Sequence, residues 1–340
     1  MEHLLTVKDL TTVFTGDSGM LTSVDHVSFH VDAGEVVCLV GESGCGKSVT
    51  SLSIMGLLSR DGRVAEGSVC FEGKELLSLR EKELDQLRGN RISMIFQDPL
   101  TSLNPVFTVG SQITESLRVH LHLPKAEASK RAIECLARVG MPDPAGVMRK
   151  YPHELSGGMR QRAMIAMALC CNPALIIADE PTTALDVTIQ AQIMALLREL
   201  QREIGMSLIL ITHDIGLVAS MADRVLVMYA GQIVESAPVR ALFKTPVHPY
   251  TRALLKTVPG IHDDRERKLI SIPGIVPEHY DQITGCRFAA RCAYRTEACS
   301  KPQAEHSFGP QHMARCGVMA ARQAEKQVVS DQMDGSRQQV

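Results

Sequence analysis

The octapeptide GESGCGKS occupies residues 41–48, directly after the apolar run of residues 35–40 and at the start of a predicted helix over residues 47–58. Glycines let backbone N–H groups point inward at a phosphate chain, and the helix start adds a favourable dipole. We expect Lys47 to reach the β- and γ-phosphates and the Ser48 hydroxyl to bind Mg²⁺. The stretch predicts an α/β fold that binds a nucleoside triphosphate through Gly41, Glu42, Ser43, Gly44, Cys45, Gly46, Lys47, Ser48 and the next residue, Val49.

Polar residues at the ends of three other apolar runs complete this candidate site. Asp179 and Glu180 end the run LIIADE at residues 175–180, as expected for an Mg²⁺-organising carboxylate followed by a residue that orients or deprotonates the attacking water. Gln97 ends RISMIFQ and is placed to touch Mg²⁺ or the water. His213 follows SLILIT and is placed to contact the γ-phosphate. We interpret Glu180, His213 and Gln97 as the catalytic residues.

A second glycine turn, LSGGMRQR at residues 155–162, lies just upstream of the LIIADE run. It places Ser-Gly-Gly at the start of a helix, which makes a phosphate cradle. The chain already has one phosphate loop, so this cradle has no obvious nucleotide of its own. It therefore implies a second, nucleotide-bearing subunit opposite it.

The remaining pattern alternates strands and helices, which argues for a sheet with helices on both faces. Residues 100–155 are helical and polar and are interpreted as an inserted helical subdomain. The predicted strands cover residues 4–14, 24–31, 35–40, 68–71, 91–96, 175–178, 207–211 and 224–228, and further helices are predicted over 187–203 and about 250–257.

Composition limits the function classes. Of the 340 residues, 22% are charged and 45% hydrophobic, and the formal net charge of −2 gives no global argument for binding nucleic acid. The longest apolar run, residues 163–171, has nine residues, whereas about 18–20 are needed to cross a bilayer. The N-terminus lacks the apolar stretch of a signal peptide. We expect a chain that does not cross a membrane alone.

In this order, GESGCGKS, Gln97, LSGGM, LIIADE, the ALD of residues 184–186, and His213 resemble the ATP-binding cassette (ABC) ATPases over about residues 4–245. The resemblance implies the P-loop NTPase fold with an N-terminal antiparallel β subdomain and an inserted α-helical subdomain. It also implies two ATPase domains arranged head to tail, so that Ser156, Gly157 and Gly158 serve the partner's ATP and Asp186 lies at the dimer seam. Phe14 resembles the aromatic residue that stacks on adenine; a core aromatic is the alternative.

Two further stretches narrow the resemblance. FQDPLTSLNP at residues 96–105 and HPYTRALL at residues 248–255 resemble ATPase subunits of dipeptide and oligopeptide importers, with the dipeptide type the most similar. This implies a peripheral ATPase on the cytoplasmic face of the cell (inner) membrane. Its implied partners are a second, related ATPase, two transmembrane permeases and an extracytoplasmic binding protein, without nucleic acid.

Other functions remain as alternatives. The same motor could serve nickel, glutathione or opine-like ligands. A soluble ABC ATPase of translation or DNA maintenance is less favoured, because the chain carries one cassette and has no sustained heptads between residues 47 and 155. A nucleotide-binding regulator without turnover is disfavoured by the intact Lys47, Glu180 and His213.

Four of the ten cysteines, Cys286, Cys292, Cys299 and Cys316, lie close together near the C-terminus, with five, six and sixteen residues between them. Disulfides are disfavoured in a reducing cytosol. Zinc also takes four thiolates but usually in closely spaced pairs, and an iron–sulfur cluster tolerates varied spacing. The spacing leaves zinc, a cluster or no metal open, while the resemblance favours a four-iron four-sulfur cluster.

These observations predict three regions. Residues 1–260 form the ATP-binding domain, with the helical insert at about 98–158. Residues 261–318 form a small C-terminal extension that carries the four cysteines. Residues 319–340 are expected to be a disordered tail.

Overall fold

The computed structural model describes residues 3–16, 19–98, 102–183, 185–257 and 271–325. Within these residues, a central sheet has the strand order β11-β12-β10-β9-β3-β8-β7-β6. Its strands are β3 (Val36–Val40), β6 (Ile92–Ile95), β7 (Leu175–Asp179), β8 (Ser207–Thr212), β9 (Arg224–Tyr229), β10 (Gln232–Pro238), β11 (His306–Gly309) and β12 (His312–Ala314).

The middle of this sheet is parallel and buried. β3 pairs in parallel with β8 and β9, and β7 pairs in parallel with β6 and β8. All residues of β3, β7 and β8 are buried, which explains why these strands are continuous apolar runs in the sequence. Parallel strands end at the same edge of a sheet, so the residues that follow them meet there.

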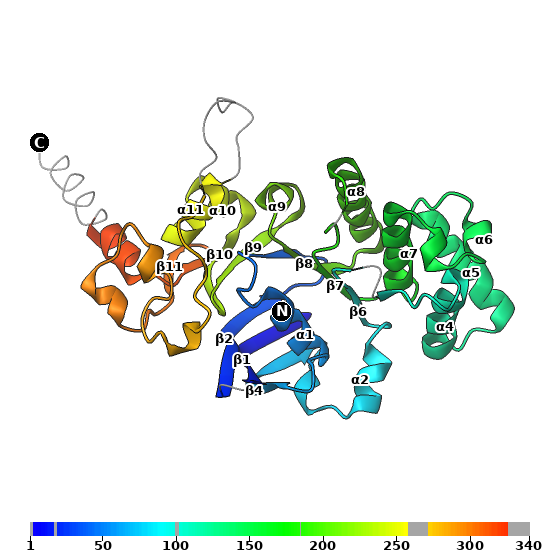
Figure 1. The fold of residues 1–340 in the computed structure, drawn as a ribbon, viewed down its shortest axis with the longest axis horizontal. Helices are drawn as coiled ribbons and strands as arrows, with labels where there is room; N and C mark the ends of the chain where they lie inside the picture. The colour runs from blue at the N-terminus through cyan, green and yellow to red at the C-terminus, as the bar shows by residue number, and fades with distance from the viewer. Residues whose placement is uncertain (1–2, 17–18, 99–101, 184, 258–270, 326–340) are drawn as a thin grey trace, which may run out of the picture.

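A second sheet lies below the central one in Figure 1 and has the order β2-β1-β4-β5. Its strands are β1 (Leu5–Gly16), β2 (Gly19–Val31), β4 (Gly62–Phe71) and β5 (Lys74–Glu75), and their pairings are antiparallel. Its buried side packs with residues of the central strands in one hydrophobic cluster. The predicted N-terminal antiparallel β subdomain is thereby confirmed.

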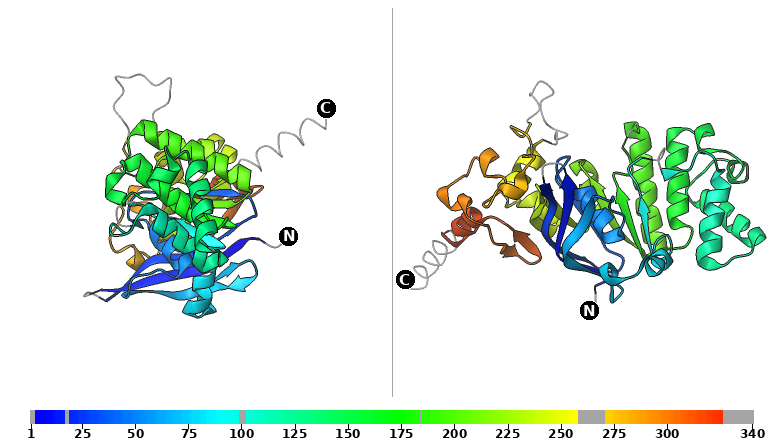
Figure 2. Two further views of the ribbon diagram at one scale, coloured as in Figure 1. Left: turned by 90° about the vertical axis from the view of Figure 1, so that its right-hand side faces the viewer. Right: turned by 60° about the horizontal axis from the view of Figure 1, so that its bottom comes forward.

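Helices pack around the central sheet and also form a separate group. That group is formed by the segment between β6 and β7 in the sequence. It extends to the right in Figure 1 and stays at that end in the second view of Figure 2. It comprises α4 (Val109–Leu121), α5 (Lys125–Arg138), α6 (Pro144–Val147) and α7 (Gly157–Leu169). The other helices are α1 (Lys47–Met55), α2 (Glu81–Leu87), α8 (Val187–Ile204), α9 (Ile215–Met221), α10 (Val239–Lys244) and α11 (Pro249–Lys256). No helix of the described residues is long and apolar enough to span a bilayer.

The C-terminal extension lies at the opposite end of the molecule from α4–α7 (Figures 1 and 2). It contains the short 3-10 helices η3 (Tyr280–Gln282), η4 (Ala289–Arg291) and η5 (Glu297–Ser300), followed by β11 and β12. Because β12 pairs with β10, the extension continues the central sheet. The predicted boundary at residue 260 falls in the segment 258–270, outside the described residues.

The predicted disordered tail is wrong at its start. Residues 317–325 are helical, and Met319 is buried in a small cluster with Val247, Ala314 and Cys316. Weak periodicity in this short helix hid it, since contact with the extension rather than intrinsic propensity keeps it folded. The rest of the predicted tail, residues 326–340, lies outside the described residues.

Candidate functional site: a nucleotide cavity at the sheet edge

The glycine-rich loop after β3 wraps around the start of α1. Gly46 has a φ of 105°, and a Cβ atom there would lie 2.7 Å from the main-chain oxygen of Ser23, so the loop requires glycine at this point. Lys47 is buried, and its amine donates hydrogen bonds to the main-chain oxygens of Gly41 (2.9 Å) and Glu42 (3.0 Å). The ammonium group is thus held above the loop, where phosphates would bind.

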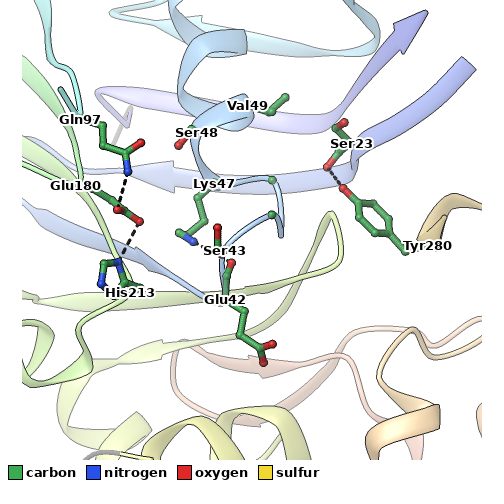
Figure 3. Close-up of a pocket in the computed structure, with 12 residues that line it drawn as sticks. Ser23, Glu42, Ser43, Lys47, Ser48, Val49, Gln97, Glu180, His213 and Tyr280 are labelled. Atoms are coloured by element: carbon green, nitrogen blue, oxygen red, sulfur yellow. Dashed lines mark hydrogen bonds and ion pairs between the residues drawn. The ribbon is translucent and has the colours of Figure 1, made fainter. Parts of the chain in front are cut away.

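Two of the predicted catalytic residues, Gln97 and His213, contact the third, Glu180. Glu180 accepts a hydrogen bond from Gln97 Nε2 at 3.0 Å, and its other carboxylate oxygen lies 3.1 Å from His213 Nδ1. Thr183 also donates to Glu180, at 3.0 Å. Figure 3 shows Gln97, Glu180 and His213 gathered on one side of the cavity that Lys47 enters. Glu180 has a φ of 44°, in the left-handed region that is uncommon for residues other than glycine.

Glu180 is ionised in this arrangement. Burial raises the pKa of its carboxyl group, but the hydrogen bonds from His213 and Thr183, together with the charges of His213 and Lys47, lower it by more. The net pKa therefore lies below the ordinary value, because hydrogen bonds to a carboxylate favour its charged form. A carboxylate in this state can accept a proton.

Asp179 lies behind the cavity and has one unsatisfied oxygen. Its Oδ1 atom is buried without a hydrogen-bond partner, while the Ser48 side chain hydrogen-bonds the carboxyl group. Burial raises the pKa of Asp179, which means that the isolated charge is unfavourable there. A buried carboxylate oxygen beside a hydroxyl is a donor set that fits Mg²⁺.

The cavity has a volume of about 560 Å³. Ten of the predicted residues line it, namely Glu42, Ser43, Gly44, Gly46, Lys47, Ser48, Val49, Gln97, Glu180 and His213. Gly41 and the buried Cys45 belong to the loop, but neither lines the cavity.

Phe14 is not among the lining residues that the structure describes. Its ring packs on Gly62, where a Cβ atom would lie 2.6 Å from it. In this structure the ring is therefore part of the packing between β1 and β4.

Two lining residues were missed by the sequence analysis, Ser23 and Tyr280. Tyr280 comes from the C-terminal extension, and its hydroxyl donates a 3.0 Å hydrogen bond to the main-chain oxygen of Ser23. The two residues are 257 positions apart. No short motif or periodicity links such distant residues, so the sequence carried no signal for this contact.

The Ser-Gly-Gly turn begins α7 and lies outside this cavity. Ser156 is the N-cap of the helix, and its hydroxyl accepts a hydrogen bond from the Met159 N–H at 3.4 Å. Ser156 and Gly157 are exposed. Asp186 caps α8 in the same way, accepting from the Ile189 N–H at 2.9 Å, and is also exposed. The structure therefore does not bring these predicted residues together with the loop of their own chain.

Known proteins resemble this chain along most of its length. The sequence matches the ABC transporter family over residues 24–183 and the oligopeptide/dipeptide transporter C-terminal region over residues 234–299. The dipeptide transport ATP-binding protein DppD of Escherichia coli is 53% identical over 296 residues, covering 87% of this chain and 90% of DppD. The chain belongs to the ABC transporter ATP-binding proteins.

Two other comparisons agree with this family. The oligopeptide transport ATP-binding protein AppD of Bacillus subtilis is 53% identical over 300 residues, covering 88% of this chain and 91% of AppD. The solved dimeric ATP-binding cassette MJ0796, bound to ADP and Pi in a post-hydrolysis state, is 29% identical with a TM-score of 0.63. The superposed region covers 69% of this chain and 99% of that cassette. The predicted ABC ATPase fold is confirmed.

The four clustered cysteines of this ABC ATPase are free thiols. The Cys286 N–H donates to the main-chain oxygen of Cys299 at 2.8 Å, so a backbone hydrogen bond joins the chain at these two cysteines. Burial raises the pKa of Cys286 to about 11 and also raises the pKa values of Cys292 and Cys316. Burial therefore favours the protonated form of Cys286, Cys292 and Cys316 unless a metal displaces the proton.

The spacing of these sulfur atoms differs from that of a closed zinc site. Zinc–sulfur bonds of about 2.3 Å place tetrahedral thiolates about 3.8 Å apart. No three of the four sulfurs lie within 4.8 Å of one another; in the described part of the chain, His3, His30 and Asp32 form the group of potential ligands that does.

Proposed function

We propose that this chain is the ATP-hydrolysing motor subunit of an importer for dipeptides or oligopeptides. The observation that carries the proposal is the cavity in which Lys47 faces an ionised Glu180 flanked by Gln97 and His213. Relatives that are named dipeptide or oligopeptide transport ATP-binding proteins supply the substrate class. The C-terminal match to oligopeptide/dipeptide transporters supports the same class.

The residues divide the work of hydrolysis by position. Lys47 and the loop N–H groups bind the β- and γ-phosphates, which puts the γ-phosphate next to Glu180. Glu180 accepts the proton of the attacking water, since its depressed pKa keeps it charged at neutral pH. His213 holds the γ-phosphate, and Gln97 orients the water from the opposite side of Glu180.

Ser48 and Asp179 are the residues that would hold Mg²⁺, with Gln97 as a further ligand. The unpartnered Asp179 Oδ1 atom beside Ser48 is the observation that fits the ion. When bound, Mg²⁺ neutralises charge that develops on the phosphate oxygens.

The exposed start of α7 supports a head-to-tail pair of ATPase subunits. Ser156, Gly157 and Gly158 present helix N–H groups to solvent, which is a suitable site for a partner's γ-phosphate. Asp186 lies at the seam in this proposal. The partner is a second ABC ATPase, preferably a related but different chain, and the pair drives two permeases supplied by an extracytoplasmic binding protein. This places the chain on the cytoplasmic face of the inner membrane.

For the cysteine site we propose a four-iron four-sulfur cluster on Cys286, Cys292, Cys299 and Cys316. The free thiols and their wide spacing in the sequence support a cluster over a single zinc ion, which is usually held by closely spaced pairs. The cluster would brace the extension, since peptide import needs no electrons. Anaerobic purification followed by iron, sulfide and zinc analysis tests this; zinc without iron would contradict it.

The hydrolysis proposal is tested with Glu180→Gln. The amide keeps the hydrogen-bonding shape of the side chain but cannot accept the proton, so turnover should fall by at least about 100-fold. ATP binding should remain, and a closed dimer should accumulate, as measured by equilibrium binding and size-exclusion chromatography. Glu203→Gln, an exposed glutamate on α8, is the matched control. Normal hydrolysis by Glu180→Gln would exclude the assigned role.

A further inference from the structure

The C-terminal extension reaches the nucleotide cavity through Tyr280. This tyrosine is 6% exposed, lines the cavity, and donates its hydroxyl to the main-chain oxygen of Ser23. Figure 3 shows Tyr280 across the cavity from Glu180 and His213. Because the γ-phosphate end of the nucleotide lies beside Glu180, the α-phosphate and the nucleoside must extend toward the side where Tyr280 stands.

Tyr280 is also packed against the turn that supports the phosphate loop. A Cβ atom on Gly231 would lie 2.9 Å from the Tyr280 ring, and Gly231 has a φ of 82°, so only glycine fits. The Gly231 N–H donates to the main-chain oxygen of Cys45 at 2.9 Å. Gly231 therefore contacts both the Tyr280 ring of the extension and the backbone of the phosphate loop.

Arg287 holds the Tyr280 ring in place by packing on one face of it. Its guanidinium stacks on Tyr280, 5.2 Å from the ring centre, and forms a 2.6 Å ion pair with Asp25. A second N–H of Arg287 donates to the main-chain oxygen of Ala230, next to Gly231. The arginine thus connects the tyrosine to the same turn.

Arg291 contacts the phosphate loop itself. Its guanidinium donates to the Glu42 carboxylate at 3.0 Å and lies over the rings of Tyr229 and Phe288. The Glu42 N–H, in turn, donates to the Tyr250 hydroxyl at 2.9 Å. The backbone N–H and the carboxylate of Glu42 are therefore both held by residues that lie outside the sequence motif of the loop.

We propose that the C-terminal extension is part of the ATP site: Tyr280 forms the wall on the nucleoside side, and Arg291 sets the loop through Glu42. Both arginines belong to the segment between Cys286 and Cys292, so the conformation of the cysteine segment sets their positions. The inference rests on the proposed function only in taking the cavity as the site of ATP. It assigns no reaction step to the extension, which positions the nucleotide.

The test compares magnesium-ATP with magnesium tripolyphosphate as ligands of the full-length chain. Arg291→Met should raise the Kd for both ligands by about tenfold, because Glu42 loses a charged hydrogen bond that holds the phosphate loop in place. Tyr280→Ala should raise the Kd for ATP by about tenfold and leave that for tripolyphosphate within about twofold. Tyr280→Phe should give a smaller rise for ATP.

A thermodynamic cycle checks the Arg291–Glu42 contact. Glu42→Gln should weaken ATP binding less in the Arg291→Met background than alone, because the two side chains act as a unit. Arg295→Met is the matched control, since this exposed arginine lies four positions away in the same extension. It should bind both ligands like the wild type.

Metal analysis and circular dichroism on each variant separate a local effect from loss of the extension. Wild-type affinity for ATP in both Arg291→Met and Tyr280→Ala, with unchanged metal content, would overturn the proposal. An equal loss in Arg295→Met would also overturn it. If the wild-type chain itself bound neither ligand, the proposed function would fail instead, so the two failures are distinguishable.

Discussion

The two sides of the nucleotide cavity are built differently. On the catalytic side, Gln97 and His213 are exposed and their described hydrogen bonds at the cavity run to Glu180. On the extension side, Tyr280 and Arg287 are buried and connected to the core by hydrogen bonds, ring contacts and an ion pair. The catalytic side is thus open for a second subunit to complete, whereas the extension side is completed within one chain.

The extension side should be the more costly to disrupt. Arg287→Met leaves Asp25 in a mostly buried place without its charged partner, and we expect the free energy of unfolding to fall by about 3 kcal/mol. Urea titration of the full-length protein measures this change. Arg80→Met is the control, because the Arg80–Glu83 pair is on the surface, where such pairs contribute less than about 1 kcal/mol. Equal effects of the two substitutions would remove the distinction between the two sides.

The open side should depend on a partner. Ser156→Arg removes the N-cap of α7 and places a bulky side chain where a partner's phosphate is expected, so hydrolysis should fall by about tenfold or more. The affinity of the substituted chain for ATP should stay nearly unchanged, since Ser156 does not line its cavity. Ser220→Arg, at an exposed position of α9, is the control. Loss of ATP binding in isolated Ser156→Arg would show that the turn serves its own chain.

The grouping of Gln97, Glu180 and His213 could be predicted because these residues follow contiguous apolar runs in the sequence. Lys47, Glu180 and His213 each come directly after a buried parallel strand or its loop, and parallel strands bring such residues to one edge. Their type and position are local properties of the sequence. The fold of the central sheet follows from the same runs.

The extension side could not be predicted in this way. Tyr280 and Ser23 are brought together by long-range packing, and β11 and β12 have four and three residues, too few for a periodic pattern. Arg287 and Arg291 lie beside the cysteines in the sequence, and nothing local indicates that they pair with the distant Asp25 and Glu42. Burial and partner choice in an irregular segment depend on the whole fold.

The smallest predicted effect concerns protonation on the catalytic side. The pKa of Glu180 is depressed, so its charged form is present above that pKa and is lost only as the pH falls through it, below the ordinary value of 4.5. His213→Ala removes the hydrogen bond that lowers this pKa most. The pKa of Glu180 should then move upward, toward its ordinary value. Infrared difference titration of the carboxylate band, with Glu180→Gln as the blank, measures the shift without requiring turnover.

A matched pair of substitutions determines whether the shift comes from the hydrogen bond. His213→Gln keeps a side-chain N–H donor and should retain most of the depressed pKa of Glu180, whereas Thr183→Val removes a different donor and should raise the pKa in the same direction as His213→Ala. If neither His213→Ala nor Thr183→Val moves the titration, the contacts on the open side do not control the charge of Glu180. The charge of Glu180 would then be set by burial and the phosphate loop. The two sides of the cavity would differ only in how exposed their residues are.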